Sequence, residues 1–474
     1  MKLSSGKNTA VKMLAASVLA FCSLTSAAEA RYIFYFIGDG MGMGHVNTTQ
    51  TYLRDVLKAP EPLLMTTFPV ASQARTYSYD SPITDSAAAG TALSTGHKTV
   101  NNRVAMSPDS VNYRSIAADF LAAGYAAGVA TSVAGDDATP AAFYAHALGR
   151  GESENIAPWA VESGLCFLAG GNFKISHTPK WEQWLDDMRK KGGYRIVRSL
   201  AELDKSAKKG KAGKGEKILF LPELNVYDQI GYTIDSIPGA TPLCDITEAC
   251  IKTVSENNPE RFFVMIEGGN IDWAAHANDG AAVIKEIMNF QQSIEQAYQF
   301  YLRHPDETLI VVTADHDTGG MALGREDNRK HPDLSLIDYQ RISKDRFNQW
   351  IEEMQKEKHT FTWPDMEETL RDKFGLWKNI PLSDDETAAL RGAFRDTFET
   401  GTGKDTETWY QSFKEFTVKL YDLVNRRYGI GWTTSSHTGN MVPVYAIGAG
   451  QELFTGSLDN TQIPMLIKQA AELK

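Results

Sequence analysis

The chain has 474 residues, a length that suits either one large α/β enzyme or about three domains of ordinary size. Hydrophobic residues make up 42% of it and aromatic residues 10%, so it can bury a sizeable core and is not a disordered protein. The net charge of −11 argues against a nucleic-acid-binding protein, whose contact surface is basic. It does not exclude an anionic substrate, because a metal ion or an arginine can reverse the field locally.

The first 30 residues are predicted to be a secretory signal peptide. Three lysines come first, a short apolar run follows at 13–24, and Ala28 and Ala30 supply the small residues of a cleavage site. The run is shorter than the roughly 20 residues that span a bilayer, so we expect no membrane span. A lipid anchor on Cys22 is the less favoured alternative, because a bulky phenylalanine precedes that cysteine. We therefore expect a periplasmic or secreted protein.

Five apolar runs have the length of β-strands, and helical patterns separate them. The runs span residues 32–37, 124–131, 262–266, 309–313 and 442–447. Helical stretches between them include 115–123 and 280–301. Near-continuous apolar strands that alternate with helices are typical of an α/β fold with a central, mostly parallel sheet and helices on both faces. In such a sheet the functional site lies at the carboxyl ends of the strands.

Two segments look like additions to this sheet. Six lysines lie among small residues at 204–217, which predicts a solvated loop. Residues 321–436 are charged and helical in pattern, and the serine–acid motif that begins at Ser383 is typical of a helix start. We expect 321–436 to be an inserted, mostly helical subdomain between two parts of the core, 31–320 and 437–474.

Three cysteines follow the signal segment: Cys166, Cys244 and Cys250. In an exported protein the last two could form a small-loop disulfide. Cys166 lies in an apolar run, which favours a buried structural thiol. The sequence has no Cys-x-x-Cys pair, so a thiolate zinc site is not expected.

Acidic and histidine side chains follow several of the predicted strands. They are Asp39, Glu267, Asp272, His276, Asp315 and His316, and His437 lies in a polar turn just before the last strand. Asp272 and His276 are four residues apart, so on a helix they face the same side and can bind one ion. Each residue alone could be a helix cap or a turn residue, but their joint occurrence at five strand ends indicates a metal site. Mixed histidine and carboxylate ligands suit zinc, and all-oxygen sets suit magnesium.

Ser86 is the candidate nucleophile. It comes just before an alanine-rich helix start, where free backbone N–H groups and the positive end of the helix attract anions. No Gly-x-Ser-x-Gly motif surrounds it, so activation by a bound metal is the better account than activation by a histidine base. The alternative is that Ser86 is simply the N-cap of the helix.

Six motifs, taken in chain order, resemble those of the alkaline phosphatase family. They lie at residues 39–42, 84–88, 137–142, 267–276, 313–316 and 436–439. The resemblance therefore runs from the first strand almost to the end of the chain. It implies an α/β sandwich with two zinc ions and one magnesium ion. It also implies a phosphomonoesterase that hydrolyses phosphate monoesters through a phosphoserine and releases inorganic phosphate.

Carried over to this sequence, the family pattern gives the motif residues separate roles. The ligands of the first zinc would be Asp272, His276 and His437, and those of the second Asp39, Asp315 and His316. The magnesium ligands would be Asp39, Thr139 and Glu267. Ser86 would be the phosphorylated nucleophile, and Arg150 the arginine that clamps the phosphate.

The sequence departs from some bacterial members at one position. They carry a lysine directly after the first zinc-site aspartate, and this chain has Trp273 there. Asp137 therefore cannot form the carboxylate–lysine pair of those members. This difference bears on magnesium affinity, phosphate release and the pH optimum, but not on the reaction class.

Alternative functions stay open at this point. A phosphodiesterase of the same superfamily would share the zinc ligands but lack the arginine clamp. The presence of Arg150 argues against this alternative. A sulfatase is less favoured, because Ala88 and Gly90 stand where its motif needs proline and arginine. A non-catalytic zinc- or phosphate-binding protein of the cell envelope would have no need of Ser86. The family resemblance also admits a homodimer, while the physiological phosphoester is not specified.

Overall fold

The computed structural model describes residues 29–203, 215–223, 228–326, 331–356, 361–408 and 410–473. The predicted signal peptide lies almost wholly outside these ranges, as does most of the lysine-rich stretch 204–217. In the described parts of the chain, no helix combines the length and apolar character needed to cross a membrane.

A ten-stranded sheet forms the centre of the molecule, in the order β16-β2-β15-β8-β1-β7-β3-β4-β6-β5. Its strands are β1 (Tyr32–Ile37), β2 (Val70–Arg75), β3 (Ala126–Thr131), β4 (Phe167–Ala169), β5 (Tyr194–Val197), β6 (Lys217–Phe220), β7 (Phe262–Glu267), β8 (Thr308–Thr313), β15 (Val442–Gly448) and β16 (Ser457–Asp459). Only β15 runs antiparallel to its neighbours β2 and β8. This confirms the predicted α/β fold with a mostly parallel sheet.

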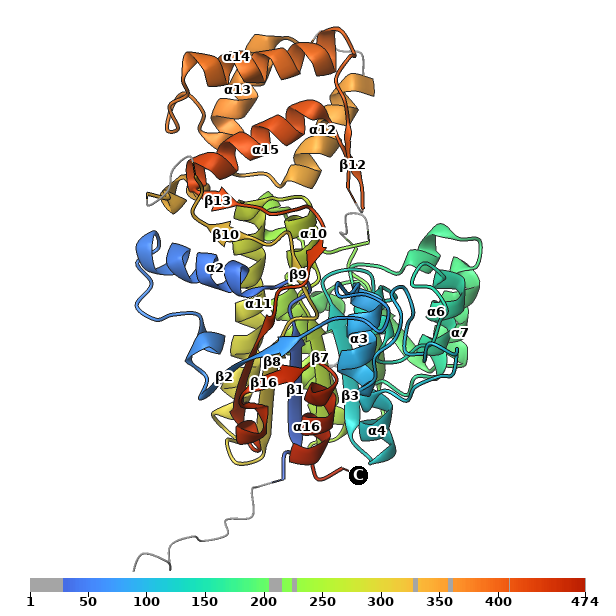
Figure 1. The fold of residues 1–474 in the computed structure, drawn as a ribbon. Helices are drawn as coiled ribbons and strands as arrows, with labels where there is room; N and C mark the ends of the chain where they lie inside the picture. Colours follow the sequence, from blue (N-terminus) through green and yellow to red (C-terminus); the bar gives the residue numbers. More distant parts are fainter. Residues whose placement is uncertain are drawn as a thin grey trace, which may run out of the picture.

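Helices cover both faces of the sheet (Figure 1). The helices of this core are α2 (Met43–Asp55), α3 (Ser86–Thr95), α4 (Ile116–Ala122), α5 (Ala138–Ala141), α6 (Ser153–Glu162), α7 (Trp181–Lys190), α9 (Leu243–Asn257), α10 (Asn270–His276), α11 (Gly280–Tyr301) and α16 (Gln462–Ala470). In Figure 1, α3, α4 and α16 lie in front of the sheet and α11 lies behind it.

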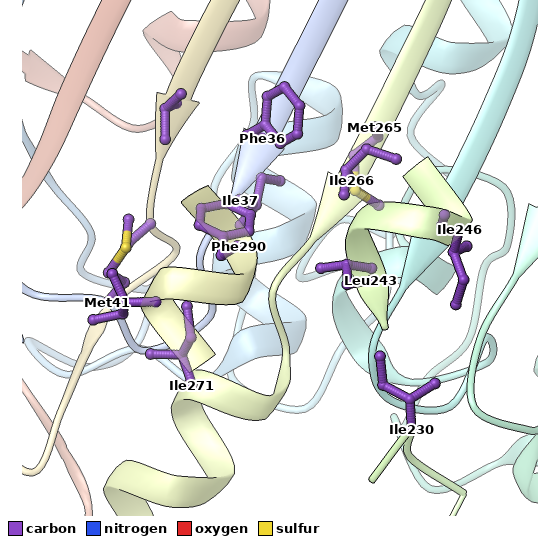
Figure 2. Close-up of a cluster of buried hydrophobic side chains, with 14 of the residues drawn as sticks. Phe36, Ile37, Met41, Ile230, Leu243, Ile246, Met265, Ile266, Ile271 and Phe290 are labelled. Carbon is purple, nitrogen blue, oxygen red and sulfur yellow. The ribbon is translucent and has the colours of Figure 1, made fainter. Parts of the chain in front are cut away.

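The two faces can be followed along the central strand β1, which is buried throughout. Phe36 packs edge-on against Phe290 of α11, with ring centroids 5.9 Å apart, and both belong to the apolar cluster in Figure 2. Tyr35 points to the other face and contacts Phe143. Full burial of such a side chain contributes about 1.5–3 kcal/mol, so the central strands are held firmly from both sides.

The register of the central strands aligns their carboxyl ends. Ile37, the last residue of β1, pairs with Glu267 of β7 on one side and with Thr313 of β8 on the other. Thr131, the last residue of β3, also pairs with Glu267. The turns after these four strands therefore meet at one edge of the sheet.

Four further helices stand together at one end of the molecule (Figure 1). They are α12 (Lys344–Lys356), α13 (Trp363–Phe374), α14 (Asp384–Phe394) and α15 (Glu415–Tyr428), all from the segment 321–436. Two short strands, β10 (Ala322–Leu323) and β13 (Ile430–Gly431), pair where this segment leaves and rejoins the core. Ser383 and Glu386 form the predicted capping box at the start of α14.

The cysteine arrangement corrects one expectation. Cys166, Cys244 and Cys250 are all free and buried. Cys244 and Cys250 lie on the same helix, α9, where six residues rise about 9 Å along the axis. Disulfide-bonded residues have Cα atoms less than ~7 Å apart, so the suggested Cys244–Cys250 bond does not form. Cys166 is a buried structural thiol, as expected, and burial raises its pKa to about 12.

Asp345 of α12 joins the helical segment to the core. One of its carboxylate oxygens accepts a hydrogen bond of 2.8 Å from the Tyr232 hydroxyl, and the Gln411 amide donates to the other. Burial raises the pKa of Asp345 from 3.8 to about 7. Between these pH values the folded chain keeps a proton that the unfolded chain has lost, so this group makes the fold less stable as the pH rises.

Asp345→Asn should remove that pH dependence. Relative to the wild type, the variant is expected to gain roughly 2 kcal/mol of unfolding free energy between about pH 5 and pH 8. Urea unfolding at the two pH values measures this difference, with Asp372→Asn, an exposed carboxylate on α13, as the control. A stability difference between variant and wild type that does not change with pH would contradict the account.

Candidate active site

The predicted site residues meet where the four central strands end. Asp39 follows β1, Thr139 lies in α5 after β3, Glu267 ends β7 and Asp315 follows β8. Their apolar neighbours belong to the buried cluster in Figure 2, in which Ile266 precedes Glu267 and Ile271 precedes Asp272. Gly40, with φ +69°, brings the turn after Asp39 so close to α10 that a Cβ there would lie 2.8 Å from the Asp272 carboxylate.

One histidine pair presents two ring nitrogens to the same point. His276 Nδ1 donates to the Ser435 carbonyl at 2.6 Å, and His437 Nδ1 donates to the Thr84 carbonyl at 2.8 Å. A neutral imidazole that donates through Nδ1 keeps a lone pair on Nε2. The two Nε2 atoms are nevertheless 3.0 Å apart, and His276 Nε2 is 3.4 Å from the Asp272 carboxylate. The two nitrogen lone pairs face one another and also face a carboxylate. A cation bound by all three groups would remove this repulsion.

His316 stands between this pair and a second set of carboxylates. Its Nε2 lies 3.1 Å from Asp315 and 3.5 Å from Asp39. Its Nδ1 donates to the Thr318 hydroxyl at 3.2 Å, because that hydroxyl donates its own proton to Asp272. His316 Nε2 is therefore also free to bind a cation. Burial lowers the pKa of His316 well below its usual value, which keeps the ring neutral.

The ligand atoms form two groups that are compact enough for a metal ion. One group is Asp39, Asp315 and His316, and the other is Asp272, His316 and His437; in each the candidate atoms lie within 4.8 Å of one another. The first is the predicted second-zinc set. The second places His316 beside Asp272 and His437, so His316 lies within reach of both positions. His276 lies next to this second group, with its Nε2 3.0 Å from His437 Nε2.

A third set of oxygens surrounds Glu267. Thr131 donates a hydrogen bond to its carboxylate, and burial raises the pKa of Glu267 to about 8. Thr139 Oγ1 is buried, and among the described residues it has no hydrogen-bond partner. The unpartnered carboxylate oxygens of Asp39 and Asp315 face His316 Nε2, so they belong to the group of His316 and not to this one. Unpartnered buried oxygens are costly, and a hard cation bound by oxygens would satisfy them. The residues therefore fit the implied magnesium.

Ser86 is the first residue of α3, but it does not cap the helix. Asp85 is the N-cap, and its side chain accepts a hydrogen bond of 2.9 Å from the Ala88 N–H. This excludes the N-cap alternative for Ser86. The Ser86 hydroxyl instead lies 3.1 Å from His316 Nε2 and 3.4 Å from an Arg150 guanidinium nitrogen.

Arg150 is held between two carboxylates. Its guanidinium lies 3.5 Å from Asp85 and 3.1 Å from Asp137. Asp137 also forms an ion pair with Lys174, whose Nζ lies 2.9 Å from the Asp137 carboxylate. Burial raises the pKa of Asp137, but Lys174 and Arg150 outweigh it and hold that pKa well below its usual value. Asp137 thus has a lysine partner, which is Lys174 and not residue 273, a tryptophan in this chain.

Tyr410 is a site residue that the sequence did not reveal. It comes from the segment 321–436, and its hydroxyl donates to Asp272 at 3.3 Å. Its ring stacks on Trp273, with centroids 4.9 Å apart at 24°, and meets the edge of His276. A cavity of about 290 Å³ lies beside these three rings, with Asp345 and residues 411–413 in its walls. The helical segment therefore contributes one wall of the site.

Known proteins share both the sequence pattern and the fold. A model of the alkaline phosphatase family matches residues 30–166 and 180–473. Alkaline phosphatase 3 of Bacillus subtilis (strain 168) is 29% identical, covering 94% of this chain and 89% of the relative. Alkaline phosphatase 4 of the same strain is 27% identical, covering 92% and 87%.

Solved structures give the same result. The cold-active alkaline phosphatase of Shewanella sp. has a TM-score of 0.77 and 28% identity, covering 93% of this chain and 99% of that one. The alkaline phosphatase of Thermus thermophilus shares the fold at a TM-score of 0.74, with 24% identity and coverage of 94% and 92%. With its motifs in order and its site residues gathered at one edge of the sheet, this chain belongs to the alkaline phosphatase family of enzymes.

Proposed function

We propose that this chain hydrolyses phosphate monoesters through a phosphoserine on Ser86, with two zinc ions and one magnesium ion, and releases inorganic phosphate. One observation carries the proposal: the Ser86 hydroxyl lies between His316 Nε2 at 3.1 Å and the Arg150 guanidinium at 3.4 Å. The candidate nucleophile therefore lies next to both a nitrogen that can bind a metal ion and a guanidinium group that can bind phosphate. A protein that only binds zinc or phosphate would not need this arrangement.

The metal ligands follow from the three sets of donor atoms. Asp272, His276 and His437 would hold the first zinc, and Asp39, Asp315 and His316 the second. Asp39, Thr139 and Glu267 would hold the magnesium. When bound, such ions neutralise negative charge and lower the pKa of hydroxyl groups and of water.

The chain's own residues orient the substrate for an in-line reaction. Arg150 can bind two non-bridging oxygens of the phosphoryl group through its planar fork. A diester has replaced one of these oxygens by an alkoxy group, so the fork favours a monoester. Ser86 Oγ forms the new P–O bond as the bond to the alcohol breaks, and water then cleaves the phosphoserine. Since Ser86 lies beside His316, the alcohol leaves on the opposite side, toward Asp272 and His276 and the cavity next to Tyr410.

The remaining assignments rest on the sequence. We infer export to the periplasm or the medium from the signal pattern at residues 1–30. Residues 31–320 and 437–474 would form the catalytic core, and 321–436 an inserted subdomain that closes one side of the site through Tyr410.

Hydrolysis of an aryl phosphate monoester, compared with the matching diester, tests the proposed function. The purified protein is loaded with zinc and magnesium at mildly alkaline pH, and a chelated sample is the control. We expect strong monoester preference that chelation abolishes, since the metals and Arg150 both act on the phosphoryl group. Preference for the diester would reject the Arg150 clamp and favour the phosphodiesterase alternative. Turnover of neither compound would favour a binding protein.

A further inference from the structure

Lys174 places a second cation in the phosphate site, from a turn that no sequence motif connects to it. Its Nζ lies 2.9 Å from one oxygen of Asp137. The same oxygen is 3.1 Å from the Arg150 guanidinium. Two cations therefore converge on one carboxylate atom, next to the nucleophile.

The structure fixes the position of Lys174 through its backbone. Asp136, which is fully buried, accepts hydrogen bonds from the Lys174 N–H at 2.6 Å and from the Ile175 N–H at 3.2 Å. Phe173 packs so tightly over Gly135 that a Cβ there would lie 2.4 Å from its ring. Two consecutive aspartates thus bind Lys174: Asp136 accepts a hydrogen bond from the lysine backbone, and Asp137 pairs with the lysine ammonium group. This is a built arrangement and not a chance surface contact.

Charge counting shows what the lysine does. Arg150 faces two carboxylates, Asp85 and Asp137. Without a second cation, these would outweigh the single charge of Arg150 and weaken the attraction of the metal-loaded site for an incoming dianion. With Lys174 the four groups balance, which leaves the Arg150 fork available to the phosphoryl oxygens. This effect matters most for a phosphate monoester, which carries two negative charges at alkaline pH where a diester carries one.

We propose that Lys174 is a specificity-determining, positioning residue: by neutralising Asp137 it lets Arg150 bind dianionic phosphoryl groups, and so sets the preference for monoesters. The inference rests on the proposed function of the same site. Lys174 acts through Asp137 and Arg150 and is not a catalytic residue. The sequence position that supplies a lysine in some bacterial relatives holds Trp273 here, so Lys174 reaches Asp137 from a different part of the chain.

Lys174→Ala tests this proposal. We expect kcat/KM for an aryl phosphate monoester to fall about tenfold, mainly through KM, because the lost charge acts on substrate binding. The inhibition constant of inorganic phosphate should rise by a similar factor. Hydrolysis of the matching diester should fall by only about threefold, because the Coulomb energy of one negative charge is half that of two. Lys174→Arg should retain most of the wild-type values.

A second substitution separates charge compensation from structural damage. In the Lys174→Ala background, Asp137→Asn removes the carboxylate that the lysine neutralises, and it should restore phosphate affinity toward the wild-type value. Lys180→Ala is the matched control, because it removes one lysine from the same part of the surface, where it pairs with Glu154. This control should leave both substrates unaffected.

Three results would overturn the proposal: equal losses on monoester and diester, no loss on either, or no recovery in the double variant. Calorimetric titration of inorganic phosphate into the metal-loaded proteins measures affinity without turnover. If the wild type binds phosphate but hydrolyses no monoester, the proposed function fails. A tenfold weaker affinity of Lys174→Ala in that titration would still support the role of the lysine.

Discussion

Ser86→Ala is expected to lower kcat for an aryl phosphate monoester by on the order of 10³-fold or more, while zinc stays bound. The reason is that Ser86 Oγ is the atom placed between His316 Nε2 and the Arg150 guanidinium, so no other hydroxyl can replace it there. The metal-binding side chains are untouched by the change. Steady-state kinetics and metal analysis by mass spectrometry measure the two quantities on the same sample.

The control for this variant lies in the same helix. Ser94, near the end of α3, is equally buried, and within the described part of the chain its hydroxyl donates to the Thr91 carbonyl at 3.3 Å and to no site residue. Ser94→Ala therefore removes the same atom from the same helix without entering the site, and it should keep nearly full activity. Near-normal turnover of Ser86→Ala would refute the nucleophile assignment.

His316→Ala is expected to have the second large effect. His316 belongs to both compact ligand groups, and its Nε2 also faces Ser86. Its loss leaves Asp39 and Asp315 as a pair of buried carboxylates without the nitrogen donor between them. We expect the chain to lose at least one zinc ion and about 10³-fold in kcat, with partial recovery at high zinc concentration.

His304→Ala serves as the comparison for that variant. His304 lies just after the carboxyl end of α11 and stacks on Phe300. The candidate ligands lie near the other end of this helix, where α10 precedes it. It should keep its zinc content and its activity. A His316→Ala protein with full zinc content and unchanged turnover would show that the metals bind elsewhere.

The elements with regular patterns could be predicted from the sequence. The helix expected at 280–301 is α11, Gly280–Tyr301, and the buried runs at 32–37 and 262–266 are central strands. Period and composition determine such elements locally. The spacing of Asp272 and His276 also placed them correctly on one face of a helix, where their side chains lie 3.4 Å apart.

Contacts made across irregular segments could not be predicted. Lys174 lies 37 positions after Asp137, in a short 3-10 turn that reaches the site only because Asp136 binds it. Tyr410 comes from the segment 321–436, whose helices carry no site motif, and its position depends on how that segment packs on the rest of the chain. The suggested Cys244–Cys250 bond was wrong for a related reason. The suggestion rested on export and on the short spacing alone, whereas α9 places both cysteines as small buried residues of one helix.

Peptide mapping after acid quenching tests the central claim most directly. The metal-loaded wild-type enzyme is quenched during turnover of a phosphate monoester, digested and searched for phosphorylated peptides by mass spectrometry. We expect phosphate on Ser86, and none there in Ser86→Ala. Rapid monoester hydrolysis with no phosphate on Ser86, and with inversion of configuration at phosphorus, would mean direct attack by water and would contradict the account.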